Sequence, residues 1–171
     1  GGLVTLTLFF THGLIFLTLK TDGDMKARAR ALATKVGIVA TVFAAAFLIW
    51  TLIAHPTLPG LVLSGVAAVT LIAALALNLM RREGLAFASV VVTVITAVSS
   101  LFVALFPNVL PSTINAAYSL NVENASSSQY TLGVMTWVAV VMIPLVLTYQ
   151  SWTYWVFRKR IRRESIPAHA H

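Results

Sequence analysis

His12 stands in the apolar stretch FFTHGLIF, where it is the one side chain that could ligate a haem iron or carry a proton. A helical metal site usually repeats a ligand three or four residues further on, and neither position holds one here. A neutral histidine that hydrogen-bonds to a neighbouring helix is tolerated in a membrane and needs no cofactor. We therefore expect His12 to be a packing residue, with ligation and proton transfer as the alternatives.

The other polar groups offer little more chemistry. Asn78 and Gln150 lie near the ends of apolar runs, and Asp22 and Asp24 stand among five cations that can balance their charge. For Glu123, in a long loop, a solvated carboxylate is the simplest interpretation; a proton exit or a partner contact is the alternative. The sequence has no paired carboxylates, glycine-rich phosphate loop, Ser/His/Asp arrangement or cysteine. We therefore predict no catalytic, cofactor-binding or metal-binding residue in this chain.

The composition is that of a membrane protein. Hydrophobic residues make up 58% of the 171 residues, charged residues make up 10%, and the mean hydropathy is +0.88. A span needs roughly 20 apolar residues, and five runs of about this length occur, at 1–19, 36–54, 60–80, 85–106 and 132–156. The runs are continuous and lack the alternation of a membrane strand. The sequence predicts an all-α polytopic protein, with residues 1–171 forming one bundle of five transmembrane helices.

The basic residues predict the orientation. The net charge is +7, but the twelve Lys and Arg residues fall into three clusters beside span ends rather than forming a nucleic-acid-binding stripe. Five alternating crossings place all three clusters on one face, which the positive-inside rule makes cytoplasmic. We expect the N-terminus outside, the C-terminus inside and no nucleic acid partner. The clusters are Lys20, Lys26, Arg28, Arg30 and Lys35; Arg81 and Arg82; and Arg158, Lys159, Arg160, Arg162 and Arg163.

Local signals predict where helices begin and bend. The second helix should begin near residue 24, with Asp24 as its N-terminal cap. The stretch Ser126–Gln129 has capping-box spacing and should begin the last helix near residue 127. Pro144 should kink that helix by removing one hydrogen bond. The loop from residue 107 to about 125 is long and apolar, so we expect it to pack on the outer helix ends or on another subunit.

Three stretches of the chain resemble subunit II of the cytochrome bd-type quinol oxidases. They are HGLIFLTLKTDGDMKARAR (12–30), with an LKTDG turn before a basic helix; PSTINAAYSLNVENASSSQYTLGVMTW (111–137), with the family's SL…NASSSQYTL…M pattern; and PLVLTYQSWTYWVFRKRI (144–161), a span that ends in an aromatic cluster and a basic tail. The match keeps its order along the whole chain and corresponds to the C-terminal half of such a subunit. Because Gly1 opens within an apolar run and no Met precedes it, we expect residues upstream of it.

The resemblance implies a respiratory complex of the bacterial plasma membrane that oxidises quinol and reduces O2 to water. In that family two haems b and one haem d belong to subunit I, and this chain would bind none of them. It would be the non-haem subunit II, which packs against subunit I and stabilises it. The further partners implied are membrane lipids, the quinol pool and a small accessory subunit.

Two other interpretations stay open on the sequence alone. A fragment of a secondary transporter or permease could also contain five spans, as part of an inverted repeat. Against it, the five runs contain no Asp, Glu, Lys or Arg, whereas ion-coupled transporters usually hold such groups within the membrane. The third interpretation is a purely structural membrane scaffold, which differs from an oxidase subunit in its partner.

Overall fold

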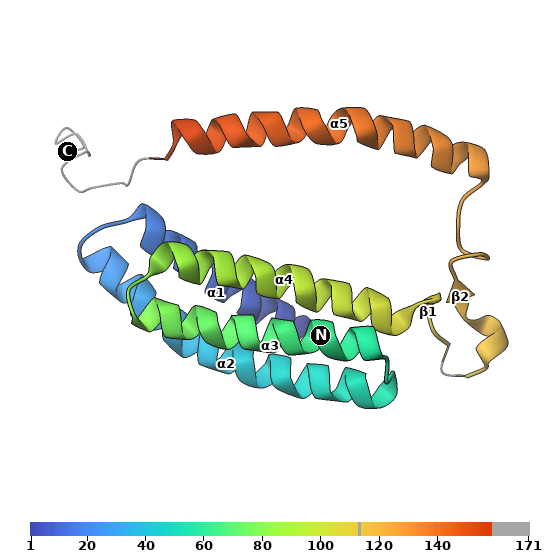
Figure 1. Cartoon of the computed structure of the whole chain (residues 1–171), viewed down its shortest axis with the longest axis horizontal. Helices are drawn as coiled ribbons and strands as arrows, with labels where there is room; N and C mark the ends of the chain where they lie inside the picture. The colour runs from blue at the N-terminus through green and yellow to red at the C-terminus, as the bar shows by residue number, and fades with distance from the viewer. Residues whose placement is uncertain (113, 159–171) are drawn as a thin grey trace, which may run out of the picture. The chain divides into compact units, whose positions relative to one another are not determined.

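The computed structural model describes residues 1–112 and 114–158 of the chain (Figure 1). Five long helices are joined by short connections and one longer loop. All five are long and apolar enough to cross a membrane, which confirms the predicted polytopic all-α class. The elements are α1 (Gly2–Lys20), α2 (Asp24–Ala54), α3 (Leu58–Leu79), α4 (Glu83–Leu105), β1 (Asn108–Leu110), the 3-10 turn η1 (Ala116–Tyr118), β2 (Leu120–Asn121) and α5 (Gln129–Val156).

The described residues form two compact units, residues 1–105 and residues 106–158. We call the first the bundle unit and the second the C-terminal unit. The bundle unit contains α1 to α4, and α3 packs against α4 along its length, as α1 does against α2. The C-terminal unit contains the hairpin and α5. The predicted inclusion of the fifth span in one bundle with the other four stays a prediction.

The core of the bundle unit is built from aliphatic side chains and alanines. Small residues let helices approach closely where no hydrophobic effect drives them together in lipid. Gly37 is the clearest case, because a Cβ there would collide with Leu75 Cδ2 and lie 3.3 Å from Thr11 Cγ2. An alanine at this crossing would therefore force the Leu75 side chain to move. The core residues are Leu8, Leu14, Ile15, Ala33, Leu71, Ala74, Ala86 and Val90.

Helix α2 begins at Asp24, as predicted, but Asp24 does not cap it. The N-cap is Gly23, with φ +70°, and no side chain makes a capping hydrogen bond there. Asp24 is already within the helix, so its carboxylate contributes through the helix dipole instead. With 31 residues, α2 is about 46 Å long and exceeds the roughly 30 Å of hydrocarbon in a bilayer. We infer that its basic first turns stand beyond the hydrocarbon.

The loop that leads to α5 is held by its own side chains. Asn121 Oδ1 accepts the backbone N–H groups of Glu123 (3.0 Å) and Asn124 (2.8 Å). Asn124 Oδ1 accepts the Asn121 N–H (2.8 Å), and its Nδ2 donates to the Ser119 carbonyl (3.1 Å). Just before this turn, β1 and β2 pair antiparallel, with an irregularity in their register. These contacts give the connection a defined shape even though none of its described side chains is buried.

A serine caps α5, two residues later than predicted. The N-cap is Ser128, whose Oγ accepts the Thr131 N–H at 3.4 Å and lies 2.9 Å from Thr131 Oγ1. Ser126, the cap residue of the predicted box, instead points its hydroxyl to the Glu123 carbonyl at 3.4 Å. The asparagine turn keeps the preceding residues out of the helix, so the last of the three serines takes the cap. Pro144 lies inside α5, and the kink predicted there stays a prediction.

Replacing Ser128 with Ala should lower the stability of the assembled protein by about 1 kcal/mol, because the Thr131 amide loses its acceptor at the membrane surface. The thermal midpoint of the purified complex measures this effect. Ser126→Ala is the matched control and should leave the midpoint unchanged. Equal losses in the two variants would show that the cap is not at Ser128.

Candidate functional site

A buried ion cluster joins α2 to α4 at the end of the bundle unit that carries the Lys and Arg residues of 20–35 and 81–82. We call this end the basic end. The Glu83 side chain is only 9% exposed, and its Oε1 lies 3.0 Å from Lys26 Nζ. The Arg30 guanidinium donates to the same oxygen. Both cations come from α2, and the carboxylate comes from the first turn of α4, where the helix dipole also favours a negative charge. We call these three side chains the basic-end clamp.

Asn78 of α3 extends the basic-end clamp to a third helix. Its side chain is fully buried, and its Nδ2 donates to Thr34 Oγ1 (3.0 Å) and to the Arg30 carbonyl (3.3 Å). Thr34 Oγ1 in turn donates to the Arg30 carbonyl (3.1 Å). Polar contacts therefore hold α2, α3 and α4 together at one end. Asn78, one of the few polar candidates within the apolar runs, has a structural role here.

The sequence alone does not predict this cluster. The pairs in the basic-end clamp are 53 and 57 residues apart in sequence, so no local pattern reveals them. The one signal available was an acid directly after two arginines at the start of a span. An ionised carboxylate this buried is costly unless cations pair with it. The cluster is therefore best explained as a structural contact that holds α2 and α4 together.

Replacing Glu83 with Gln should destabilise the bundle unit by about 3 kcal/mol, because Arg30 would lose its counter-charge. Among the described residues, Lys26 would keep only the more distant Asp22 carboxylate, at 4.0 Å. Both cations are about one-fifth exposed, so solvent screening offsets little of this loss. The thermal midpoint of the complex measures it. Glu123→Gln makes the same chemical change at an exposed loop carboxylate and should leave the midpoint unchanged. An unaltered midpoint in Glu83→Gln would contradict the fastening role.

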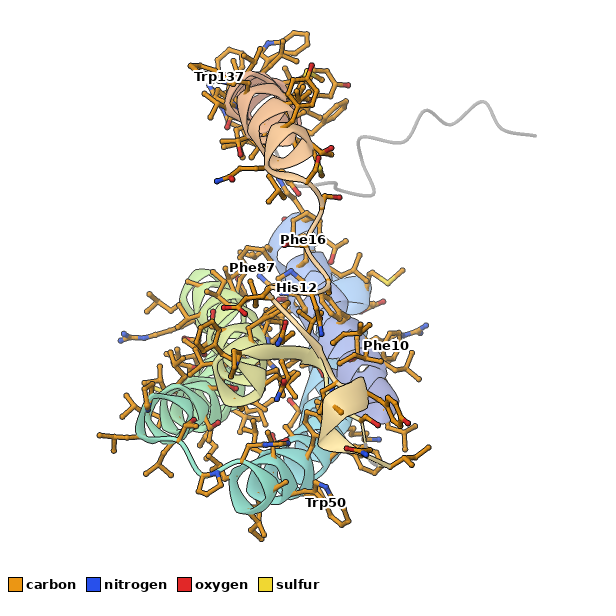
Figure 2. All side chains as sticks on the ribbon, turned by 90° about the vertical axis from the view of Figure 1, so that its right-hand side faces the viewer. Phe10, His12, Phe16, Trp50, Phe87 and Trp137 are labelled. Carbon is orange, nitrogen blue, oxygen red and sulfur yellow. The ribbon has the colours of Figure 1, made fainter. Side chains whose placement is uncertain are left out.

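His12 packs against an aromatic ring rather than a hydrogen-bonding partner. Its ring centroid lies 4.8 Å from that of Phe87 of α4, with 30° between the planes, and Phe16 lies 5.8 Å from the same ring (Figure 2). Its Nδ1 is buried, and no described residue hydrogen-bonds to it. The expected packing role fits this geometry, but the expected hydrogen bond is not seen at Nδ1. The reason is that α4 presents an aromatic ring there.

Metal-ligating side chains do not gather in the part of the chain that the structure describes. No three His, Asp or Glu side chains lie close enough to hold an ion among these residues. Glu123 is exposed on the loop of the C-terminal unit, and Gln150 is exposed on α5. The interpretation of Glu123 as a solvated carboxylate stays a prediction, as do its alternatives.

An apolar cavity of about 190 Å³ lies among α1 to α4, toward the end opposite the basic-end clamp. Alanine and leucine side chains form much of its wall. The hydroxyls of Thr41 and Thr93 also line it, but each donates to a carbonyl of its own helix, at 2.8 and 2.9 Å. The cavity therefore has the character of a dry hollow and lacks the converging polar groups of a catalytic pocket.

The amino-acid sequence matches a known family. The sequence model for cytochrome bd terminal oxidase subunit II matches residues 1–157. The chain belongs to this family. The relatives found for this family member include cytochrome bd ubiquinol oxidase subunit 2 of Bacillus subtilis, which is 36% identical over 171 residues, covering 94% of this chain and 49% of the relative.

More distant relatives of this subunit II chain give the same result. Cytochrome bd-I ubiquinol oxidase subunit 2 of Escherichia coli K12 is 28% identical over 205 residues, covering all of this chain and 54% of the relative. A probable cytochrome oxidase subunit 2 of Haemophilus influenzae is 25% identical over 187 residues, covering 90% of this chain and 49% of the relative. The chain thus spans about half the length of the curated relatives it matches. Family membership confirms the resemblance seen in the sequence and favours it over a transporter fragment.

Proposed function

We propose that this chain is part of the non-haem subunit II of a quinol oxidase that reduces O2 to water in a bacterial plasma membrane. The observation that carries the proposal is the family match over residues 1–157. The described residues also fit a subunit that binds no haem itself, because their polar side chains fasten helices to one another. The two haems b and the haem d belong to subunit I in this proposal, and quinol is the substrate of the complex.

The C-terminal unit supports the proposed packing against subunit I. No residue of α5 is buried within this unit. The loop before α5 also exposes large apolar side chains, among them Leu110 (66%), Ile114 (90%) and Tyr118 (71%). A loop outside the hydrocarbon that is shaped by its own hydrogen bonds and exposes such groups is typical of an interaction surface. We infer that residues 106–128 dock onto subunit I, while a docking site on the outer helix ends is the alternative.

Purification of the native complex in mild detergent tests the proposed function. We expect a larger companion protein to copurify and the preparation to show haem b and haem d bands in a reduced-minus-oxidised spectrum. Quinol should drive O2 consumption by the same preparation. A colourless preparation without that companion would contradict the proposal.

Replacing His12 with Leu should leave the haem bands of the complex unchanged, because the His12 ring packs on Phe87 and ligates nothing in this proposal. Leu keeps an apolar contact with that ring, so the complex should also assemble in normal yield. The visible spectrum per mole of complex is the measurement. Loss of a haem band at normal yield would show that His12 is a ligand.

Reporter domains test the proposed orientation, with the N-terminus outside. Fusions in the α2–α3 connection and in residues 106–128 should read out as external, because neither connection contains Lys or Arg. Fusions in the basic α1–α2 connection are the control and should read out as cytoplasmic. The reverse pattern would overturn the orientation.

A further inference from the structure

The connection between α3 and α4 places an arginine in a conformation that favours glycine. Arg81 has φ +62°. Its N–H donates to the Asn78 carbonyl at 3.2 Å, and the Arg82 N–H donates to the Leu77 carbonyl at 2.9 Å, which closes the end of α3. Helices commonly end in this way with glycine at the left-handed position. A side chain at this position strains the backbone, so Arg81 stands where glycine would be less strained.

The carboxylate next to this turn does not neutralise the positive charges of Arg81 and Arg82. Glu83 follows Arg82 directly, but its carboxylate is buried in the basic-end clamp with Lys26 and Arg30. Arg81 and Arg82 are both exposed, and neither guanidinium lies within 4.0 Å of a carboxylate in the described parts of the chain. Two adjacent cations therefore point into the surroundings without a counter-ion from these residues.

The apolar residues around the turn place the two arginines at the membrane boundary. Leu79 and Met80 are 64% and 62% exposed, and Leu85, on the first turn of α4, is 53% exposed. Both α3 and α4 are membrane-spanning candidates that end at this turn. Apolar side chains of this kind lie among acyl chains, and long cationic side chains next to them reach the phosphate level.

We propose that Arg81 and Arg82 bind the phosphate of an anionic phospholipid in the leaflet at the basic end of the bundle. Guanidinium groups match phosphate oxygens in paired hydrogen bonds, so two adjacent arginines suit a phosphodiester better than a diffuse cationic surface does. The bound headgroup offsets the strain at Arg81, which a glycine would avoid. This site does not depend on the proposed quinol oxidation.

The strain and the charge can be separated by substitution. Arg81→Gly removes both, and Arg81→Lys keeps both the charge and the strained backbone. Arg82→Gln removes one charge without touching the strained residue. Arg28→Gln is the matched control, because Arg28 is an exposed cation on α2 without a carboxylate within 4.0 Å among the described residues.

The measurement is native mass spectrometry of the full oxidase complex, equilibrated with equal amounts of phosphatidylglycerol and phosphatidylcholine. We expect Arg81→Gly and Arg82→Gln each to lower the preference for phosphatidylglycerol at this site about fivefold, the factor that corresponds to about 1 kcal/mol per cation. Arg28→Gln should keep most of the preference, whereas Arg81→Lys should lose part of it because an ammonium group cannot form the paired hydrogen bonds of a guanidinium. In phosphatidylcholine alone, Arg81→Gly should raise the thermal midpoint because the strain is gone.

Two results would overturn the proposal. If Arg28→Gln lowers the preference as much as Arg81→Gly does, the attraction is a diffuse property of the basic surface. If Arg81→Gly and Arg82→Gln both leave the preference unchanged, the arginines do not bind lipid, whatever happens to the midpoint.

Discussion

The interior of a bilayer offers no water to a polar group, and this constraint governs the polar contacts within the described helices. Threonine hydroxyls within the helices donate to a carbonyl one turn back, as Thr11 does to Thr7 (2.8 Å) and Thr96 to Val92 (2.8 Å). Such a side chain can lie inside a span because it brings its own partner. The charged residues are instead concentrated near helix ends, where the most buried of them, Glu83, is paired with two cations.

The same constraint explains why the two units differ. The bundle unit has a core of its own and a polar fastening at one end, so its four helices define one another's positions. The C-terminal unit has a shaped loop and a capped helix, but no residue of α5 is buried within it. Exposing the apolar surface of α5 to lipid carries no free-energy cost. Exposing apolar side chains of a loop to water outside the lipid is unfavourable. The loop is therefore the part of the chain for which a protein partner has the clearest physical reason.

The buried polar side chains of this chain make contacts between helices. His12 contacts an aromatic ring, Asn78 fastens three helices, and Glu83 is occupied by the basic-end clamp. Two of the polar candidates from the sequence, His12 and Asn78, are thus used for contacts between helices, as is Glu83. This use suits the proposed role as the non-haem subunit, which needs precise helix contacts and leaves the redox centres to subunit I.

The sequence by itself determined the five spans, the start of α2, a serine cap on α5 and membership in the subunit II family. These features depend on local composition and on short motifs, so they can be read along the chain. Only the tertiary structure decided that Glu83 meets Lys26 and Arg30, that His12 meets Phe87, that Ser128 is the cap, and that Arg81 is strained. A transmembrane helix is apolar on nearly every side, so the periodicity that reveals the buried face of a soluble helix is almost absent. The rotation of each helix, and with it the contacts between helices, is set by tertiary interactions, both apolar packing and polar contacts such as the basic-end clamp.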